Sequence, residues 1–383
     1  MRVLICPDKF AGTLSAPEVA AAVAAGWHEH APADETLLRP LADGGPGFVE
    51  VLASAVDGRR LPVATVDPLG RPAAGEILLA GDASTGIAAT GVTAYVESAQ
   101  ACGLHLLSAE ERDPKRTTSY GLGLLIAAAV ETGARRIVVG LGGSATNDAG
   151  AGMLAALGAT PLDETGRALP YGGAALAAVA SLDGVARLRD VELVAATDVD
   201  NPLTGLHGAS NVYGPQKGAT REDVLLLDAA IERFAAVLER DLPGCPPGLA
   251  ALPGAGAAGG LGAAILALGG RCESGIALVT RLIGLDEALD RVDLVITGEG
   301  SFDHQSLRGK VVAGVAGAAR DRGLPCVVLA GRISAGRRES AAAGITEAYS
   351  LVEHFGDDVE RAMREPAEGL RAIATRLAGQ WSR

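Results

Sequence analysis

Short apolar runs alternate with alanine-rich helical stretches along the whole chain, and this alternation limits the possible folds more than any other feature. Helical stretches such as Ala16–His28 and Lys310–Arg322 follow several of the apolar runs. Strands that alternate with helices build α/β folds with largely parallel sheets. The runs that we expect to form buried strands are Arg2–Cys6, Ile137–Leu141, Glu192–Ala196, Asp293–Thr297 and Cys326–Ala330.

Polar turns that contain glycine end four candidate strands, two near each end of the chain. In open α/β sheets, ligands bind beyond the carboxyl ends of the strands. We therefore predict that both chain ends, residues 1–69 and 286–383, form one parallel-sheet domain. An inserted second α/β domain, residues 70–285, would split it, with the active site in the cleft between the two. The four turns are Asp8–Gly12, Ala42–Gly45, Thr297–Gly300 and Ala330–Arg332.

Composition excludes several classes of protein. A length of 383 residues predicts two domains or three. A formal charge of −13 and an aromatic content of 3% argue against a nucleic-acid partner. No apolar run approaches the roughly 18 residues of a membrane span, and no signal-peptide pattern is present, so we expect a cytoplasmic protein. The five cysteines are scattered without a CxxC spacing, which disfavours structural zinc and disulfide frameworks.

The strongest local motif lies at residues 137–150, where an apolar run enters a glycine turn before a helical stretch. A strand, a glycine turn and a helix start together form an anion site. The same turn fits the G-x-G-x-x-A pattern of dinucleotide-binding folds, so a nicotinamide-dependent oxidoreductase and a purely structural turn remain alternatives. A Walker A motif is absent. The residues that we expect to contact phosphate are Gly142, Gly143, Ser144, Asn147 and Asp148.

Charged residues near other predicted strands and turns are further candidates. Asp198 follows a strand and could orient a hydroxyl group or hold Mg²⁺. Lys217 lies between two glycines and could face a phosphate. Glu299 and Asp303 could bind a metal, and Lys310 stands at a helix start. Turn formation, solvation and helix capping are the alternative interpretations of these residues.

Seven segments, taken together and in order, resemble the bacterial glycerate kinase family of the type without a P-loop. The family phosphorylates D-glycerate with ATP and Mg²⁺, most often to 2-phosphoglycerate. The resemblance implies a flavodoxin-like α/β domain that is split by an inserted second α/β domain. The oligomeric state stays open, and a homo-oligomer is possible. The segments are Cys6–Phe10 with Gly12–Ser15, Leu41–Gly45, Gly140–Gly152, Asp198–Gly208, Tyr213–Thr220, Pro253–Gly262 and Ile296–Lys310.

This resemblance leads to a hypothesis for each candidate. The turn from Gly142 to Asp148 would hold the ATP phosphates, with Lys217 and Lys310 as neutralising charges. Asp198 is the first choice, and Asp43 the second, for orienting or deprotonating the substrate hydroxyl. Glu299 and Asp303 would bind Mg²⁺, and the glycerate carboxylate would contact Lys9, Ser15 and Arg332.

Four residues depart from the family pattern: Ala11, Pro46, Phe48 and Ser301. They stand where the family usually has a lysine, a glutamate, a threonine and a basic residue. Because all four fall in strand-end turns, they affect substrate choice more than fold or reaction class. A kinase for another small hydroxy acid therefore remains an alternative. A glycerate 3-kinase also stays open, because glycerate carries both hydroxyls, and a non-catalytic ligand sensor is a third alternative.

Overall fold

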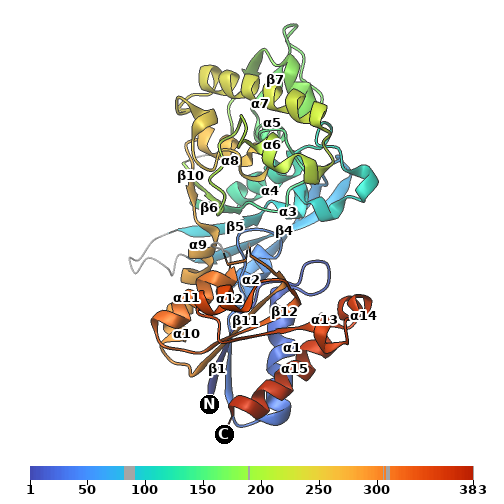
Figure 1. Cartoon of the computed structure of the whole chain (residues 1–383). Helices are drawn as coiled ribbons and strands as arrows, with labels where there is room; N and C mark the ends of the chain where they lie inside the picture. The colour runs from blue at the N-terminus through green and yellow to red at the C-terminus, as the bar shows by residue number, and fades with distance from the viewer. Residues whose placement is uncertain (82–90, 189, 305, 308–310, 383) are drawn as a thin grey trace. The chain divides into compact units, whose positions relative to one another are not determined.

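The structure is a computed structural model that describes residues 1–81, 91–188, 190–304, 306–307 and 311–382. It contains two compact units (Figure 1). Unit 1 comprises Met1–Asp43, Glu50–Val56 and Ile276–Arg383, and unit 2 comprises Gly44–Val49 and Asp57–Gly275. Each unit contains a largely parallel sheet with helices, so the predicted α/β class is confirmed. The predicted domain boundaries after residues 69 and 285 stay a prediction.

Unit 1 is built on a five-stranded sheet in the order β13-β12-β11-β1-β2, and every neighbouring pair is parallel. Counted along the chain, this order is 2-1-3-4-5, which is one of the common doubly wound arrangements. Strand β1, which lies between β11 and β2, is apolar and buried except for Arg2, as expected for a parallel strand that is covered on both faces. The strands are β1 (Arg2–Ile5), β2 (Glu35–Leu38), β11 (Leu294–Phe302), β12 (Cys326–Ile333) and β13 (Glu347–Ser350).

Two strands of unit 1 continue further than the sequence predicted. We expected turns from Thr297 and from Ala330, but β11 runs to Phe302 and β12 to Ile333. The two strands pair with each other as far as Phe302 and Ile333, and these hydrogen bonds extend both strands beyond their apolar runs. Glu299, Ser301 and Arg332 therefore lie on strands rather than in turns.

The helices of unit 1 bury their apolar faces in a core that includes Trp27, Leu370 and Leu377. α1 and α15 lie side by side (Figure 1), and a Cβ at Gly26 would lie 2.2 Å from the carbonyl oxygen of Arg371, so glycine permits this close contact. The helices are α1 (Ala16–His30), α2 (Phe48–Ala55), α9 (Gly275–Leu282), α10 (Leu285–Leu289), α11 (Val311–Asp321), α12 (Arg337–Ala342), α13 (Leu351–His354), α14 (Val359–Arg364) and α15 (Pro366–Trp381). The first two residues of α2 and the first of α9 belong to unit 2.

Unit 2 contains a six-stranded sheet in the order β10-β9-β6-β5-β4-β3. Its β10-β9-β6-β5 part is parallel, whereas β3, β4 and β5 pair antiparallel. The sequence did not predict the antiparallel part. The strands are β3 (Gly58–Val66), β4 (Pro72–Gly81), β5 (Val92–Glu97), β6 (Arg136–Gly140), β9 (Glu192–Ala196) and β10 (Arg271–Glu273), and β7 (Thr160–Leu162) pairs separately with β8 (Ser181–Asp183).

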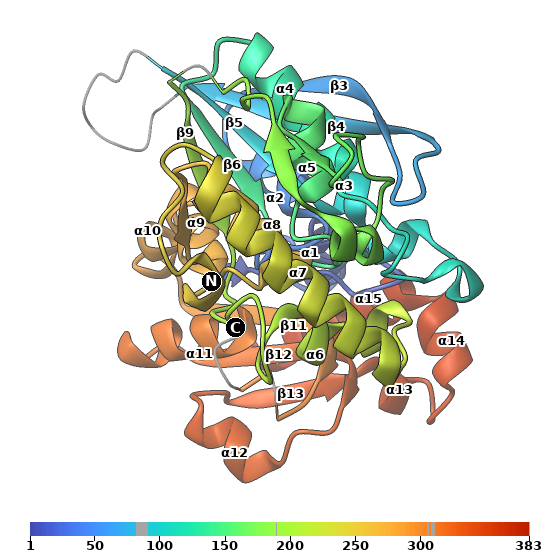
Figure 2. The same ribbon diagram turned by 90° about the horizontal axis from the view of Figure 1, so that it is seen from above.

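The helices of unit 2 pack on a second apolar core that includes Leu122, Met153 and Phe234. α7 lies beside α6 and α8 (Figure 2), and it begins where the Thr220 hydroxyl accepts a hydrogen bond from the N–H of Asp223. None of the helices in the described part of the chain has the length and apolar character needed to cross a membrane. The helices are α3 (Ala99–Cys102), α4 (Tyr120–Glu131), α5 (Ala151–Leu157), α6 (Ala209–Tyr213), α7 (Arg221–Asp241) and α8 (Ala257–Ala267).

Candidate functional site

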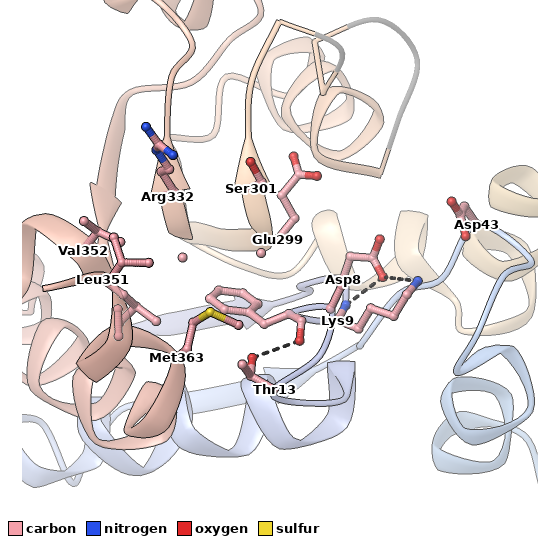
Figure 3. A pocket seen from close by; sticks show the side chains of 16 residues that line it. Asp8, Lys9, Thr13, Asp43, Glu299, Ser301, Arg332, Leu351, Val352 and Met363 are labelled. Carbon is pink, nitrogen blue, oxygen red and sulfur yellow. Dashed lines mark hydrogen bonds and ion pairs between the residues drawn. The ribbon is translucent and has the colours of Figure 1, made fainter. Parts of the chain in front are cut away.

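A pocket of about 480 Å³ lies in unit 1 at the carboxyl ends of β1, β11 and β12 (Figure 3). Ligands of doubly wound folds bind at this edge of the sheet. Four residues that the sequence singled out line it together: Lys9, Asp43, Glu299 and Arg332. The structure thus brings residues from both ends of the chain into one pocket.

Pairing between strands explains why three of the polar side chains converge. Successive residues of a strand point to opposite faces of the sheet, so Glu299 and Ser301 share a face. Ser301 pairs with Arg332 across the parallel β11–β12 register, which places Arg332 on that face as well. Figure 3 shows the three side chains on the same side of the two strands. Ser301, one of the departures from the family pattern, lines the pocket, and so does Ala11.

Asp8 also lines the pocket, in the turn after β1, although it was not among the residues predicted from the sequence. Its Oδ1 accepts a 2.7 Å hydrogen bond from the backbone N–H of Lys9 and lies 3.6 Å from the Lys9 ammonium nitrogen. Burial raises the pKa of Asp8, the charge of Lys9 opposes that rise, and nearby Asp43 adds to it. Asp8 therefore orients Lys9 and compensates part of its charge.

Another wall of the pocket is apolar, and no pattern in the sequence indicates it. Phe10 contributes from the segment after β1, Leu351 and Val352 from α13, and Val359 and Met363 from α14. Apolar residues on short helices are indistinguishable from core residues in a sequence. The pocket thus joins a polar half to an apolar half.

Two candidates of unit 1 do not line this pocket, and a third cannot be placed. Ser15 precedes α1, where its N–H donates to the Glu18 carboxylate and its hydroxyl donates to Glu50. Asp303 accepts a 3.2 Å hydrogen bond from the N–H of Ser306 within a tight turn. Lys310 lies outside the described residues.

The glycine turn after β6 is mostly enclosed in unit 2. Gly143 is exposed and Gly142 half-buried, but the side chains of Ser144, Asn147 and Asp148 are buried. The exposed part of the turn is therefore backbone. Asn147 donates a 2.8 Å hydrogen bond to Ser210, inside the unit.

Asp148 accepts hydrogen bonds at the starts of two helices. Its carboxylate receives them from the N–H and the hydroxyl of Ser119, each at 2.8 Å, and from the N–H groups of Gly150 and Gly152 at 3.1 and 3.2 Å. Burial raises its pKa, and these hydrogen bonds oppose the rise. The anion at the start of α5 is thus a side chain of the chain itself.

Lys217 is buried beside the same turn. Its ammonium nitrogen lies 3.0 Å from the Ser144 hydroxyl oxygen and 2.7 Å from the carbonyl oxygen of Thr146, and it donates to both. Burial lowers the pKa of Lys217 to about 7, and the negative charge of Asp148 opposes that decrease. In this structure Lys217 holds the turn from within the unit.

The glycines of the turn allow close packing of backbone within unit 2. A Cβ at Gly140 would lie 2.6 Å from the carbonyl oxygen of Gly44, and one at Gly142 would lie 2.6 Å from the Cα of Gly45. Two departures from the family pattern lie in this packed segment: Pro46 contacts Gly143, and Phe48 packs edge-on against Tyr95. Packing therefore accounts for at least two glycines of the motif.

Asp198 lines a separate pocket of about 290 Å³ in unit 2. Its carboxylate accepts a 2.5 Å hydrogen bond from the hydroxyl of Ser274, and Asp200 and Glu273 line the same pocket. Within the described ranges, no group of three or more His, Cys, Asp or Glu side chains is placed to hold a metal ion.

Comparisons with known proteins agree over almost the full length of the chain. The model of the glycerate kinase family matches residues 3–382. Glycerate 2-kinase of Escherichia coli K12 is 41% identical, over 99% of this chain and 100% of that protein. Glycerate kinase of Bacillus subtilis is 40% identical, over 98% of this chain and 99% of that protein. A crystal structure assigned as glycerate kinase 2 of Salmonella typhimurium LT2 superposes with a TM-score of 0.80 at 40% identity, over 99% of this chain and 98% of that one. These matches do not favour an oxidoreductase.

Proposed function

Because the chain belongs to the glycerate kinase family, we propose that it transfers the γ-phosphoryl group of ATP to the 2-hydroxyl of D-glycerate. Besides membership of the family, the proposal is supported by the polar residues that line one half of the unit 1 pocket. There, Lys9 and Arg332 lie with Asp43 and Glu299 around a space at the ends of the strands. Cationic groups of this kind suit a small carboxylate and a phosphoryl group.

Phosphoryl transfer depends mainly on positioning and on neutralising charge. Arg332 presents a guanidinium group that can pair with the glycerate carboxylate through two parallel hydrogen bonds. Lys9, oriented by Asp8, supplies a second positive charge. The backbone of half-buried Gly142 and exposed Gly143 remains our proposed contact for the ATP phosphates.

Two carboxylates are candidates for orienting or deprotonating the attacking hydroxyl. Asp198 is the first choice, and its hydrogen bond from Ser274 holds the carboxylate in a defined position. Asp43, the second choice, lines the pocket that contains Lys9 and Arg332. A kinase needs one such group within hydrogen-bonding distance of the hydroxyl.

Magnesium fits the residues at the unit 1 pocket in the way usual for kinases. Mg²⁺ is commonly held by one or two carboxylates together with substrate phosphates, rather than by a complete protein cage. Glu299 lines the pocket and can supply one carboxylate there. Asp303, the second candidate from the sequence, does not line the pocket and would have to bind the ion from beside it. When bound, the ion would neutralise phosphate charge during transfer.

The test is an assay of the full chain with ATP, Mg²⁺ and D-glycerate, followed by phosphorus NMR of the product. A phosphate on C2 couples to one proton and gives a doublet, whereas a phosphate on C3 couples to two and gives a triplet. We expect the doublet. Absence of glycerate-dependent ATP consumption would refute the proposal, and a triplet would assign a 3-kinase. Faster turnover of another small hydroxy acid in parallel assays would assign a different substrate.

A further inference from the structure

We propose that the apolar half of the unit 1 pocket binds the purine base of the nucleotide. This inference rests on the proposed function, since that function makes ATP a substrate. It extends the function by naming the wall against which the base would lie. That wall consists of Phe10, Leu351, Val352, Val359 and Met363, and we call it the apolar wall.

The size of the pocket exceeds what the acid substrate needs. Pockets of 300–1,000 Å³ typically hold ligands of drug or nucleotide size, and this one measures about 480 Å³. D-glycerate has only three carbons, and each carries oxygen. It therefore has no apolar face to match the apolar wall, and a larger ligand with a flat apolar surface fits better.

Two side chains of the wall are unusually open to water. Val359 is 50% exposed and Met363 is 57% exposed, although both are large and apolar. Both lie on α14, and both line the same pocket. A ligand that covered them would remove apolar surface from water, which is the main favourable contribution to binding at such sites.

The neighbouring polar groups identify the kind of ligand. Figure 3 shows Leu351, Val352 and Met363 grouped on one side of the pocket, with Asp8, Lys9 and Asp43 toward the other. A nucleotide has the same division, because an apolar ring system is joined to charged phosphates. Lys9 carries a positive charge that suits a phosphate, and a purely hydrophobic ligand would not use it.

The position in the sheet supports the same ligand. The strand order reverses between β1 and β11, because β2 lies on one side of β1 and the later strands lie on the other. In doubly wound sheets, nucleotides and related cofactors bind at the point of reversal, beyond the carboxyl ends of the strands. The pocket is lined by Asp8–Phe10, which follow β1 in the chain, and by Glu299–Ser301, which lie on β11.

The experiment compares Val359→Asp and Met363→Asp with the unchanged full-length protein. Calorimetric titration with ADP, in the absence of glycerate, measures affinity without requiring turnover. We expect each variant to bind ADP at least about tenfold more weakly, and KM for ATP to rise to a similar degree. KM for D-glycerate, measured at saturating ATP, should change less than about threefold. The matched control is Leu225→Asp, because Leu225 is 66% exposed on α7 and lines no described pocket. This control variant should leave the ADP affinity, the KM for ATP and the KM for D-glycerate unchanged.

Hydrogen exchange provides a second measurement that needs no substitution. ADP should slow amide exchange in residues 351–364 of the unchanged protein, because the bound base would cover α13 and α14. Unchanged exchange there, or ADP affinity equal to that of the unchanged protein in both Asp variants, would overturn the inference. An equal loss in Leu225→Asp would also overturn it.

The outcomes separate this inference from the proposed function. ATP-dependent phosphorylation of glycerate with an unaffected nucleotide KM in both variants would refute the base site alone. The opposite outcome is also informative. If the unchanged protein phosphorylates no glycerate but the Asp variants lose affinity for the nucleotide, the base site would be supported and the proposed function refuted.

Discussion

The side chain of Lys217 is 1% exposed, and burial lowers its pKa from the ordinary 10.5 to about 7. Between these pH values the unfolded chain keeps a proton that the folded chain has released. Stability linked to this group must therefore increase as pH rises through that window. The cost of burying the charge is largest below about pH 7, where the folded protein keeps the proton.

We predict that Lys217→Met removes this dependence on pH. Relative to the variant, the unchanged protein should gain about 2 kcal/mol in free energy of unfolding between about pH 7 and about pH 9. Urea unfolding of both proteins at the two pH values measures the difference. Lys115→Met is the control, because the Asp223 carboxylate raises the pKa of Lys115. Lys115 therefore stays protonated in both the folded and the unfolded protein throughout this range. Equal pH slopes for the unchanged protein and Lys217→Met would show that the amine stays protonated.

One pair of variants distinguishes Asp198 from Asp43 as the residue that orients the attacking hydroxyl. If Asp198 orients the attacking hydroxyl, Asp198→Asn should lower kcat by about 100-fold or more, because amide cannot replace carboxylate in proton transfer. Ser274→Ala should lower kcat less, since it removes a hydrogen bond to Asp198 but leaves the carboxylate itself in place. Steady-state kinetics of Asp198→Asn and Asp43→Asn, with melting curves to verify folding, decide between the two. Near-normal turnover of Asp198→Asn, with loss in Asp43→Asn, would transfer the role to Asp43.

At the scale of elements, the glycine turn after β6 depends on what packs against it. Gly140 ends the strand, and a Cβ there would lie 2.6 Å from the carbonyl oxygen of Gly44 and 2.7 Å from the ring of Phe48. Backbone cannot move aside as a flexible side chain can. The first glycine of the motif is therefore required for packing, whichever ligand the exposed glycines contact.

We predict that Gly140→Ala destabilises unit 2 by roughly 1–3 kcal/mol, the usual cost of an overpacked site. Gly317→Ala is the matched control, because Gly317 lies within α11 and, apart from its chain neighbours and the backbone of its own helix, no described atom lies within 4 Å of the new Cβ. Alanine favours helix over glycine, so this control should be neutral or stabilising by up to about 1 kcal/mol. Denaturant unfolding followed by circular dichroism measures both changes. Equal stability of Gly140→Ala and the unchanged protein would contradict the close contact.

At the scale of the whole molecule, the two units have separate apolar cores. The two tryptophans of the chain, Trp27 and Trp381, both belong to unit 1. Tryptophan fluorescence therefore reports the unfolding of unit 1, whereas far-ultraviolet circular dichroism reports both units. Multidomain proteins often depart from two-state unfolding.

We predict that Gly140→Ala lowers the midpoint of unfolding measured by circular dichroism and leaves the fluorescence midpoint nearly unchanged. Gly317→Ala lies in unit 1, so any stabilisation should raise the fluorescence midpoint and, because circular dichroism reports both units, should raise the circular-dichroism midpoint only in part. Guanidinium titrations with both probes on the same samples measure the midpoints. Coincident shifts of both probes in both variants would mean that the two units unfold as one cooperative structure.

The sequence by itself determined the α/β class, the five predicted strands and the polar positions near their ends. These features are local, because a short apolar run and the residues after it appear in the sequence as they appear in the sheet. Lys9, Asp43, Glu299 and Arg332 were found in this way. Parallel strands also bring their carboxyl ends to one edge, so the convergence of these residues in one pocket follows from the class of fold.

Only the tertiary structure decided which candidates are open and which are buried. Burial of Asp148 and Lys217 depends on segments distant in the sequence, such as Ser119 and Thr146, whose hydrogen bonds replace those of water. The extension of β11 arises from its pairing with β12, and the antiparallel half of the unit 2 sheet has no signal in the local pattern. The apolar wall is likewise invisible in the sequence, because Met363 is chemically suited to a core or to a pocket. What surrounds a side chain after folding determines which of the two it serves.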